Sequence, residues 1–406
     1  MILFLNYTIF IIELICLIRL VSILGVKNLY TLFYFAVFYY AQAVFLDYIV
    51  FGKDNILTTS RVVFISPKNP DFLYATLCYY LFLQTFYFLA LKSKKIIKKA
   101  NDNSSQVLRN ISFQYSFVLI LLAGYNLYTF VSHFGLQRNE LGGEQTPVTL
   151  ILYNTAIYTG IFTITGFKKQ NIASLIYIVV LAVYLLFSFE REPVLIAGLI
   201  ILFKYGQKIN DKLLIFLMPL GILILAFYKL FFSTFLYTGG TGLAGFQGGV
   251  NETEFSFAGI DPLSSFAILC DYFNHNIYED YTLSYITNFY GQAFRMFFGG
   301  DYKSISEYAS MYYTYGTYGM AFSMIMESLL NFSYFGPIVL AFAISKIYNR
   351  IYKKRSEIFI SLLVIATFIC IKLIRTEVMT LLKIQIVPAL ISYYLFNYLN
   401  KRKIVS

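Results

Sequence analysis

Three charged residues stand side by side in the sequence SFEREPVLIAG (188–198): Glu190, Arg191 and Glu192, followed by Pro193. An arginine side chain presents a planar fork of N–H donors that matches two oxygens of a phosphate group. A neighbouring glutamate can orient this fork, and Glu192 could also act as a base toward a hydroxyl group. The alternative interpretation is a solvated turn in which the two glutamates neutralise Arg191. The side of a membrane on which the turn lies bears on this choice.

Other cations stand inside apolar runs that we expect to cross a membrane, namely Lys229, Lys372 and Lys383. Ionisable residues within membrane spans are candidates for function. Lys372 and Arg375 are three residues apart, so they share one face of a helix. Together with Arg191 they could form a cation cluster that binds a pyrophosphate group. The alternative is that the lysines reach the interface and pair with nearby glutamates.

Two acids and a histidine complete the set of candidates. Glu327, in GMAFSMIMESLLNFSYFGPIVLAF, either pairs with one of those lysines or begins a membrane span near the interface. Glu13, in the first apolar run, has no evident partner in the sequence. His275, in DYFNHNIYEDY, stands beside Asp271 and Asp280, and its ordinary pKa suits proton transfer near neutral pH. A surface histidine is the alternative.

The composition is that of a membrane protein. Hydrophobic residues make up 58% of the 406 residues and charged residues 13%, whereas soluble domains carry about 25% charged residues. The net charge of +11 comes from lysine clusters beside apolar runs, a pattern that reports membrane orientation and argues against nucleic-acid binding. The chain has no Trp, so we expect its 37 Tyr to supply the interfacial aromatic belt.

The sequence indicates no metal, disulfide framework or cofactor. Cys16, Cys78 and Cys370 fall inside apolar runs, Cys270 stands alone in an expected loop, and no Cys-x-x-Cys spacing occurs. The glycine-rich stretch at 239–249 lacks the Gly-Lys-Ser/Thr of a nucleotide-binding loop. It is expected to be a flexible hinge or a place where the backbone closely approaches a bulky ligand.

An apolar run of about 20 residues is long enough to cross a bilayer. The sequence predicts an all-α polytopic membrane protein with about 11 such spans, at roughly 2–24, 28–51, 70–91, 111–134, 147–167, 171–189, 193–209, 213–237, 317–346, 356–375 and 378–397. Most Lys and Arg residues lie in alternate connections, above all at 92–99, 346–355 and 401–403. These connections are therefore expected in the cytoplasm, which places the N-terminus outside and the C-terminus inside.

This topology predicts three parts: a bundle of about eight spans at 1–237, an extracytoplasmic loop at 238–316, and three spans at 317–406. The loop is rich in Tyr and Phe, which suits a partly helical flap with aromatic faces for stacking on sugar rings. The turn that carries Arg191 falls on the outer side, where a cation does not serve as an orientation signal.

One segment resembles a known family. The segment from Gly319 to Phe342 resembles the C-terminal signature of bacterial oligosaccharide repeat-unit polymerases, the Wzy-type O-antigen or capsule polymerases. The matching residues are Gly319, Ser323, Glu327, Asn331, Phe332 and Gly336. Ser333 stands where the family often has a glycine. The arrangement of spans, the late outer loop and an isolated arginine in an outer turn, here Arg191, are also similar.

The resemblance implies a metal-independent membrane glycosyltransferase of the bacterial inner membrane. Such an enzyme transfers a glycan from undecaprenyl pyrophosphate to the next lipid-linked repeat unit and uses no cofactor. Its partners would be these lipid-linked oligosaccharides, the bilayer, a chain-length regulator and a flippase. The leaving group is a pyrophosphate, whose developing charge fixed cations stabilise.

Under this interpretation several residues of the chain take specific roles. Arg191 would bind the pyrophosphate with Lys372 and Arg375, and Arg138 would reach the second lipid-linked substrate. Lys229 and Lys383 would add positive charge at the same site. Glu192 and His275 are the candidate catalytic acids or bases.

Three other classes of protein fit parts of the pattern. A glycan flippase or other transporter would be expected to spread its charges along a central cavity and to have short outer loops. An O-antigen ligase has a similar architecture but transfers the glycan to the lipid A core. A non-enzymatic membrane scaffold needs none of the intramembrane cations.

Overall fold

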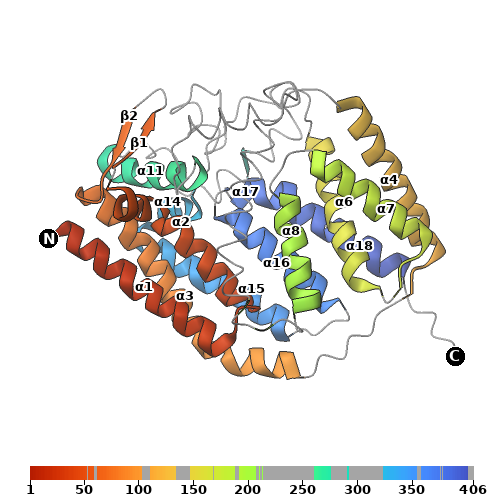
Figure 1. Cartoon of the computed structure of the whole chain (residues 1–406), viewed down its shortest axis with the longest axis horizontal. Coiled ribbons are helices and arrows are strands. Elements are labelled where there is room, and N and C mark those ends of the chain that lie inside the picture. The colour runs from red at the N-terminus through yellow and green to blue at the C-terminus, as the bar shows by residue number, and fades with distance from the viewer. Residues whose placement is uncertain are drawn as a thin grey trace. The chain divides into compact units, whose positions relative to one another are not determined.

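The structure, a computed structural model, consists mainly of helices over the part of the chain that it describes (Figure 1). The described residues are 1–52, 54–58, 62–102, 110–133, 147–167, 169–187, 192–206, 210, 213, 260–275, 290–291, 323–353, 358–374, 376 and 378–400. The chain divides into two compact units, and α16 (Phe359–Leu373) contributes to both.

Unit 1 comprises Met1–Asn103, Phe255–Lys354 and Ile369–Leu381. Its elements are α1 (Ile2–Leu24), α2 (Leu29–Phe51), β1 (Asn55–Thr58), β2 (Val62–Ile65), α3 (Pro70–Asp102), α11 (Ile260–His275), α14 (Met324–Phe332), a 3-10 turn (Ser333–Phe335), α15 (Gly336–Lys353) and α17 (Val378–Leu381). α3 is the central helix, since it packs on α1, α2, α11, α14 and α15.

The first two helices have lengths and ends that their sequences explain. Each contains 23 residues, and at about 1.5 Å per residue such a helix is long enough to cross the roughly 30 Å hydrocarbon core of a bilayer. The Asn28 side chain caps α2 by accepting a hydrogen bond of 2.9 Å from the Tyr30 N–H. Gly52 ends the helix in the left-handed conformation, at φ 68.

Aromatic rings fill the contact between α2, α3 and α15. The Tyr30 ring lies 5.1 Å from the Phe86 ring and 5.3 Å from the Tyr348 ring, centroid to centroid. The Tyr30 hydroxyl lies 3.1 Å from Ser93 Oγ on α3 and donates to the Ser345 carbonyl on α15 at 3.0 Å. One side chain therefore joins three helices.

The structure departs from the all-α prediction at one place. β1 and β2 form an antiparallel hairpin in which Asn55 pairs with Ile65. Each strand has only four residues. A pattern this short, between two long apolar runs, does not predict a strand from the sequence. The Ile and Val residues of the hairpin favour extended backbone.

α11 packs on α2, α3 and both strands of the hairpin. The Phe266 ring lies 4.7 Å from the Phe72 ring of α3 and is stacked on Tyr79. Cys270, expected in a loop, is instead buried within this helix. This helix accounts for part of the expected outer loop, which was predicted to be partly helical. The flap stays a prediction.

Unit 2 comprises Ser104–Glu254, Arg355–Phe368 and Leu382–Ser406. Its elements, besides the first part of α16, are α4 (Phe113–His133), α6 (Pro147–Gly166), α7 (Ile172–Phe187), α8 (Glu192–Ile200), a π turn η1 (Ile201–Tyr205), a second π turn η5 (Leu382–Ile386) and α18 (Val387–Leu399). α6 packs on α4, α7 and α18.

Small residues let α6 approach its neighbours closely. A Cβ atom on Gly160 would lie 2.6 Å from Leu181 Cδ2 of α7, and one on Gly166 would lie 2.7 Å from the Phe396 ring of α18. The Thr159 hydroxyl lies 3.1 Å from Ser392 Oγ of α18. Close approach through small residues and interhelical hydrogen bonds is typical of helix packing in membranes.

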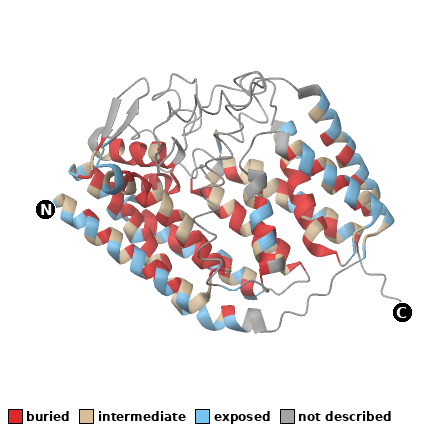
Figure 2. Ribbon diagram, viewed as in Figure 1, coloured by how far each residue is buried: buried red, intermediate tan, exposed pale blue. Residues whose placement is uncertain are grey.

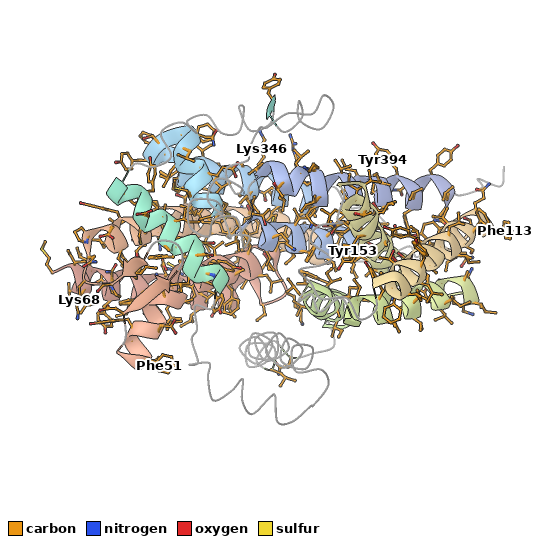
Figure 3. The ribbon with its side chains drawn as sticks, turned by 90° about the horizontal axis from the view of Figure 1, so that it is seen from above. Phe51, Lys68, Phe113, Tyr153, Lys346 and Tyr394 are labelled. Atoms are coloured by element: carbon orange, nitrogen blue, oxygen red, sulfur yellow. The ribbon has the colours of Figure 1, made fainter. Side chains whose placement is uncertain are left out.

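Figure 2 shows how burial differs between helices. Only 28% of the most apolar part of α1 is buried, against 72% of α2, so α1 is peripheral in unit 1 and α2 is mostly buried. Tyr394 of α18 and Lys346 of α15 project from their helices in Figure 3, and both are exposed.

Six helical segments in the described part of the chain are long and apolar enough to span a membrane. They are Ile2–Leu24, Leu29–Phe51, Pro70–Lys98, Phe113–Val131, Val148–Gly166 and Met324–Lys353. Shorter apolar helices occupy Ile172–Leu185, Leu195–Lys204 and Phe359–Leu373. The protein is therefore a multi-pass membrane protein by the length and composition of its helices.

The finer predictions of topology have different outcomes. The expected span at 213–237 lies outside the described residues, except for Leu213. The expected span at 317–346 is not one continuous helix, because the 3-10 turn separates α14 from α15. The count of 11 spans and the division at residues 237 and 316 stay predictions.

Candidate functional site

The segment that resembles the polymerase signature folds as a pair of packed helices, α14 and α15. Ser323 caps α14, because its side chain accepts a hydrogen bond of 3.2 Å from the Ile325 N–H. The same hydroxyl lies 3.0 Å from the Tyr79 hydroxyl of α3. The start of α14 is thus fixed to the central helix of unit 1.

Glu327 lies one turn into α14 and is fully buried. Its Oε2 accepts a hydrogen bond of 2.8 Å from the backbone N–H of Val378, which is 51 residues further along the chain. Val378 is the first residue of α17, so this N–H group belongs to the N-terminus of a helix, where an acidic side chain interacts favourably with the helix dipole. Glu327 therefore attaches α14 to the beginning of the last helical run.

The other signature residues support this arrangement. Asn331 donates a hydrogen bond of 2.7 Å from its side chain to the backbone carbonyl of Glu327. A Cβ atom on Gly336 would lie 2.1 Å from the carbonyl oxygen of Ser328, so only glycine permits the close approach of α15 to α14. Phe332, in contrast, is exposed. Gly319 lies outside the described residues.

The described residues at the two ends of the connection between α16 and α17 both make hydrogen bonds. The Ile374 N–H donates to the Ile371 carbonyl at 3.3 Å, and Val378 is bound by Glu327. Lys372 stands in the last turn of α16, half-buried, where a cation interacts favourably with the C-terminal end of the helix dipole. Arg375, in the sequence between α16 and α17, lies outside the described residues.

Lys383 lies in the π turn η5, and its side chain is half-buried. π turns within helices are frequent at functional sites. This one precedes Pro388, which lacks the N–H needed to continue the α-helical hydrogen-bond pattern. Gln385 of the same turn accepts a hydrogen bond of 2.6 Å from the Tyr158 hydroxyl of α6. Lys383 belongs to unit 2 and Lys372 to unit 1, so the predicted cation cluster stays a prediction.

The remaining predicted site residues lie at or beyond the edges of the described segments. Glu192 is the first residue of α8 and His275 is the last residue of α11, and in both cases only the backbone is described. Three further candidates fall outside the described residues: Arg138, Arg191 and Lys229. The proposed roles of these five residues stay predictions.

Sequence reasoning singled out Glu327 but missed its partner. A backbone N–H group has no signature in the sequence, although the first N–H groups of every helix need an acceptor. Glu327 was expected to pair with a lysine or to begin a span, and the contact with Val378 adds a different role.

The structure indicates no metal centre in the part of the chain that it describes, since no three His, Cys, Asp or Glu residues gather there. All four cysteines are buried and have unpaired thiols. No protein-family model, curated protein or solved structure matches the chain. The contact between Glu327 of α14 and Val378 of α17 is therefore the main geometric guide to function.

Proposed function

We propose that the protein polymerises undecaprenyl-pyrophosphate-linked oligosaccharide repeat units into O-antigen or capsular polysaccharide on the outer face of the bacterial inner membrane. The observation that carries the proposal is the hydrogen bond from Val378 to Glu327. It attaches the helix that resembles the polymerase signature to the turn between Lys372 and Val378, in which Arg375 stands.

The chemistry fits this arrangement. The reaction displaces a pyrophosphate, and cations held in fixed positions stabilise the charge that develops on it. Glu327 acts as a positioning residue that holds the turn, while Arg375, Lys372 and Arg191 bind the phosphate oxygens. Glu192 or His275 accepts the proton of the attacking sugar hydroxyl.

The proposed topology has 11 spans with the N-terminus outside. Contacts in unit 1 support it, because segments expected on one side of the membrane touch each other. α11 and the β1–β2 hairpin, both expected outside, pack together. Tyr30, Ser93 and Ser345, all at expected cytoplasmic ends of their helices, share hydrogen bonds.

Substitution of Arg191 tests the proposed phosphate site. Arg191→Ala should abolish polymerisation, seen as loss of the glycan ladder on a gel, while the amount of protein in the membrane is unchanged. Arg191→Lys should restore little activity, because a point charge does not reproduce the two-pronged contact. Glu192→Gln should have a smaller effect unless Glu192 is the base. A ladder of normal length from Arg191→Ala would refute the assignment.

A matched pair of substitutions tests the positioning role of Glu327. Glu327→Gln keeps a side-chain oxygen that can accept from Val378, so we expect most of the activity to remain. Glu327→Ala removes the acceptor and leaves the partly buried Val378 N–H group without it, which costs up to about 1–3 kcal/mol, so activity should fall strongly. Equal loss in both variants would show that Glu327 acts through its charge.

A further inference from the structure

Glu13 lies near the middle of α1 and its side chain is fully buried. It is the twelfth of the 23 residues of this helix, so about 17 Å of helix separates it from either end. The residues around it on the exposed face of α1 are apolar, for example Ile11 and Ile15. The carboxyl group therefore points toward α2 and α3, the helices on which α1 packs.

Only a few polar groups surround this carboxyl group. Gln42 of α2 donates a hydrogen bond of 2.7 Å from Nε2 to Glu13 Oε2. Within the described residues, Glu13 Oε1 has no hydrogen-bond partner, and neither has Nε2 of Gln84 on α3. Cys16 donates to Gln84 Oε1 at 3.6 Å, and the Tyr34 hydroxyl donates to the backbone carbonyl of Glu13 at 3.2 Å.

No positive charge balances Glu13 within the described residues. The ionisable groups that interact with it are Cys16 on its own helix, Tyr34 on α2 and Tyr80 on α3, and none of them is a cation. Arg19 of α1 is exposed and interacts with Cys16. A buried carboxylate with no cation beside it costs more free energy than the whole stability of a typical folded protein, so such a group takes up a proton instead.

The described residues do not supply the ligands that a metal ion would need at this site. Hard cations need several oxygen ligands, whereas the described residues contain no cluster of three acidic, Cys or His side chains. A proton needs neither space nor further ligands.

We propose that Glu13 is a proton-binding site in the core of unit 1, and that release of its proton is coupled to separation of α1 from α2 and α3. A hydrated glutamate is ionised at neutral pH, so the separated arrangement releases the proton that the packed arrangement holds. Raising the pH therefore favours separation. This device is independent of the proposed glycan reaction.

Infrared spectroscopy of the full chain in lipid nanodiscs tests the protonation state. The wild type should show the carbonyl stretch of a protonated carboxylic acid at neutral pH, and Glu13→Gln should lack this band. Gln42→Leu should keep the band but shift it to higher frequency, because the carbonyl group loses its hydrogen-bond donor. The Gln42→Leu shift also identifies the band if Glu13→Gln does not fold. An acid band that neither substitution changes would overturn the proposal.

Thermal unfolding tests the coupling to helix packing. At or below about pH 4, where a hydrated glutamate also keeps its proton, the wild type and Glu13→Gln should unfold at similar temperatures, because the amide replaces a carboxyl group that is neutral in both states. At alkaline pH the wild type should lose more stability than the Gln variant. Equal losses in the two proteins would show that Glu13 does not couple protonation to packing.

Discussion

Ser333 connects α14 to α15 with an unusual backbone, at φ 52 and ψ −147. It is the one non-glycine residue with positive φ in the part of the chain that the structure describes. A side chain in this region of backbone space costs about 1–3 kcal/mol, whereas glycine adopts it without this cost.

Ser333→Gly should therefore stabilise the protein by about 1 kcal/mol, since relief of strain exceeds the added freedom of the unfolded chain. Ser333 is exposed, so Ser333→Ala, which keeps the strain, is the matched control and should change little. Thermal unfolding in detergent measures both. A Gly variant no more stable than the Ala variant would argue against strain at this turn.

Cys270 offers a second residue-scale test. Burial, together with the negative charges of Asp71 and Asp271, raises the pKa of its thiol well above the ordinary value. Because the thiolate is the reactive form, Cys270 should react very slowly with a maleimide at neutral pH in the folded protein, and fast after unfolding. A protein with the three other cysteines replaced by serine isolates the signal. Rapid labelling before unfolding would mean that α11 is not packed as described.

At the scale of elements, hydropathy predicts the positions of the helices more accurately than the breaks within them. Apolar runs located α1, α2 and α3 to within a few residues at their starts, because lipid demands length and apolarity. The breaks at 201–205, 333–335 and 382–386 were not predicted. Such breaks depend on contacts between helices, such as the close approach of Gly336 to α14, and hydropathy does not report these contacts.

Tyrosine was expected mainly at the membrane interface, and the structure divides it between two roles. Tyr394 and Tyr398 are exposed on α18, but Tyr30, Tyr115 and Tyr177 are fully buried. The buried hydroxyl groups bond to neighbouring helices, as Tyr115 does to Thr163 at 3.1 Å. Sequence composition gives the number of tyrosines but not this division.

Removing one such hydroxyl should weaken unit 1. Tyr30→Phe removes the contacts to Ser93 and Ser345 and should destabilise the protein by about 1–2 kcal/mol, because the two serine hydroxyls lose a buried partner. Tyr394→Phe, at an exposed position, is the matched control and should have almost no effect. Equal unfolding temperatures for the two variants would contradict the role of Tyr30 in joining α2, α3 and α15.

At the scale of the whole molecule, the distribution of cations predicts the orientation. Reporter fusions after residues 100, 208 and 355 should be cytoplasmic, and fusions at 140 and 270 extracytoplasmic, because the first set follows the Lys-rich connections. Alkaline phosphatase, which is active only outside the cytoplasm, gives the readout. An active fusion at residue 355 would reverse the orientation and place the Lys372–Val378 turn on the cytoplasmic side.

The candidate site was predictable only in part. Glu327 stood out because an acid in an apolar run is rare, and the structure gives it a partner in the same unit. Its hydrogen bond with Val378 was not predictable, because the backbone donor comes from a segment distant in the sequence. The roles of Arg138, Arg191 and Arg375 are predicted from the sequence and the resemblance alone.

The most direct test of the proposed function is deletion of the gene, followed by gel analysis of the surface glycan. A polymerase deletion should leave single repeat units on the cell surface, and the wild-type gene should restore the ladder. A surface without any repeat units would indicate a flippase, and polymer retained on the carrier lipid would indicate a ligase. Either of those results, or a ladder of normal length in the deletion strain, would contradict the assignment as a repeat-unit polymerase.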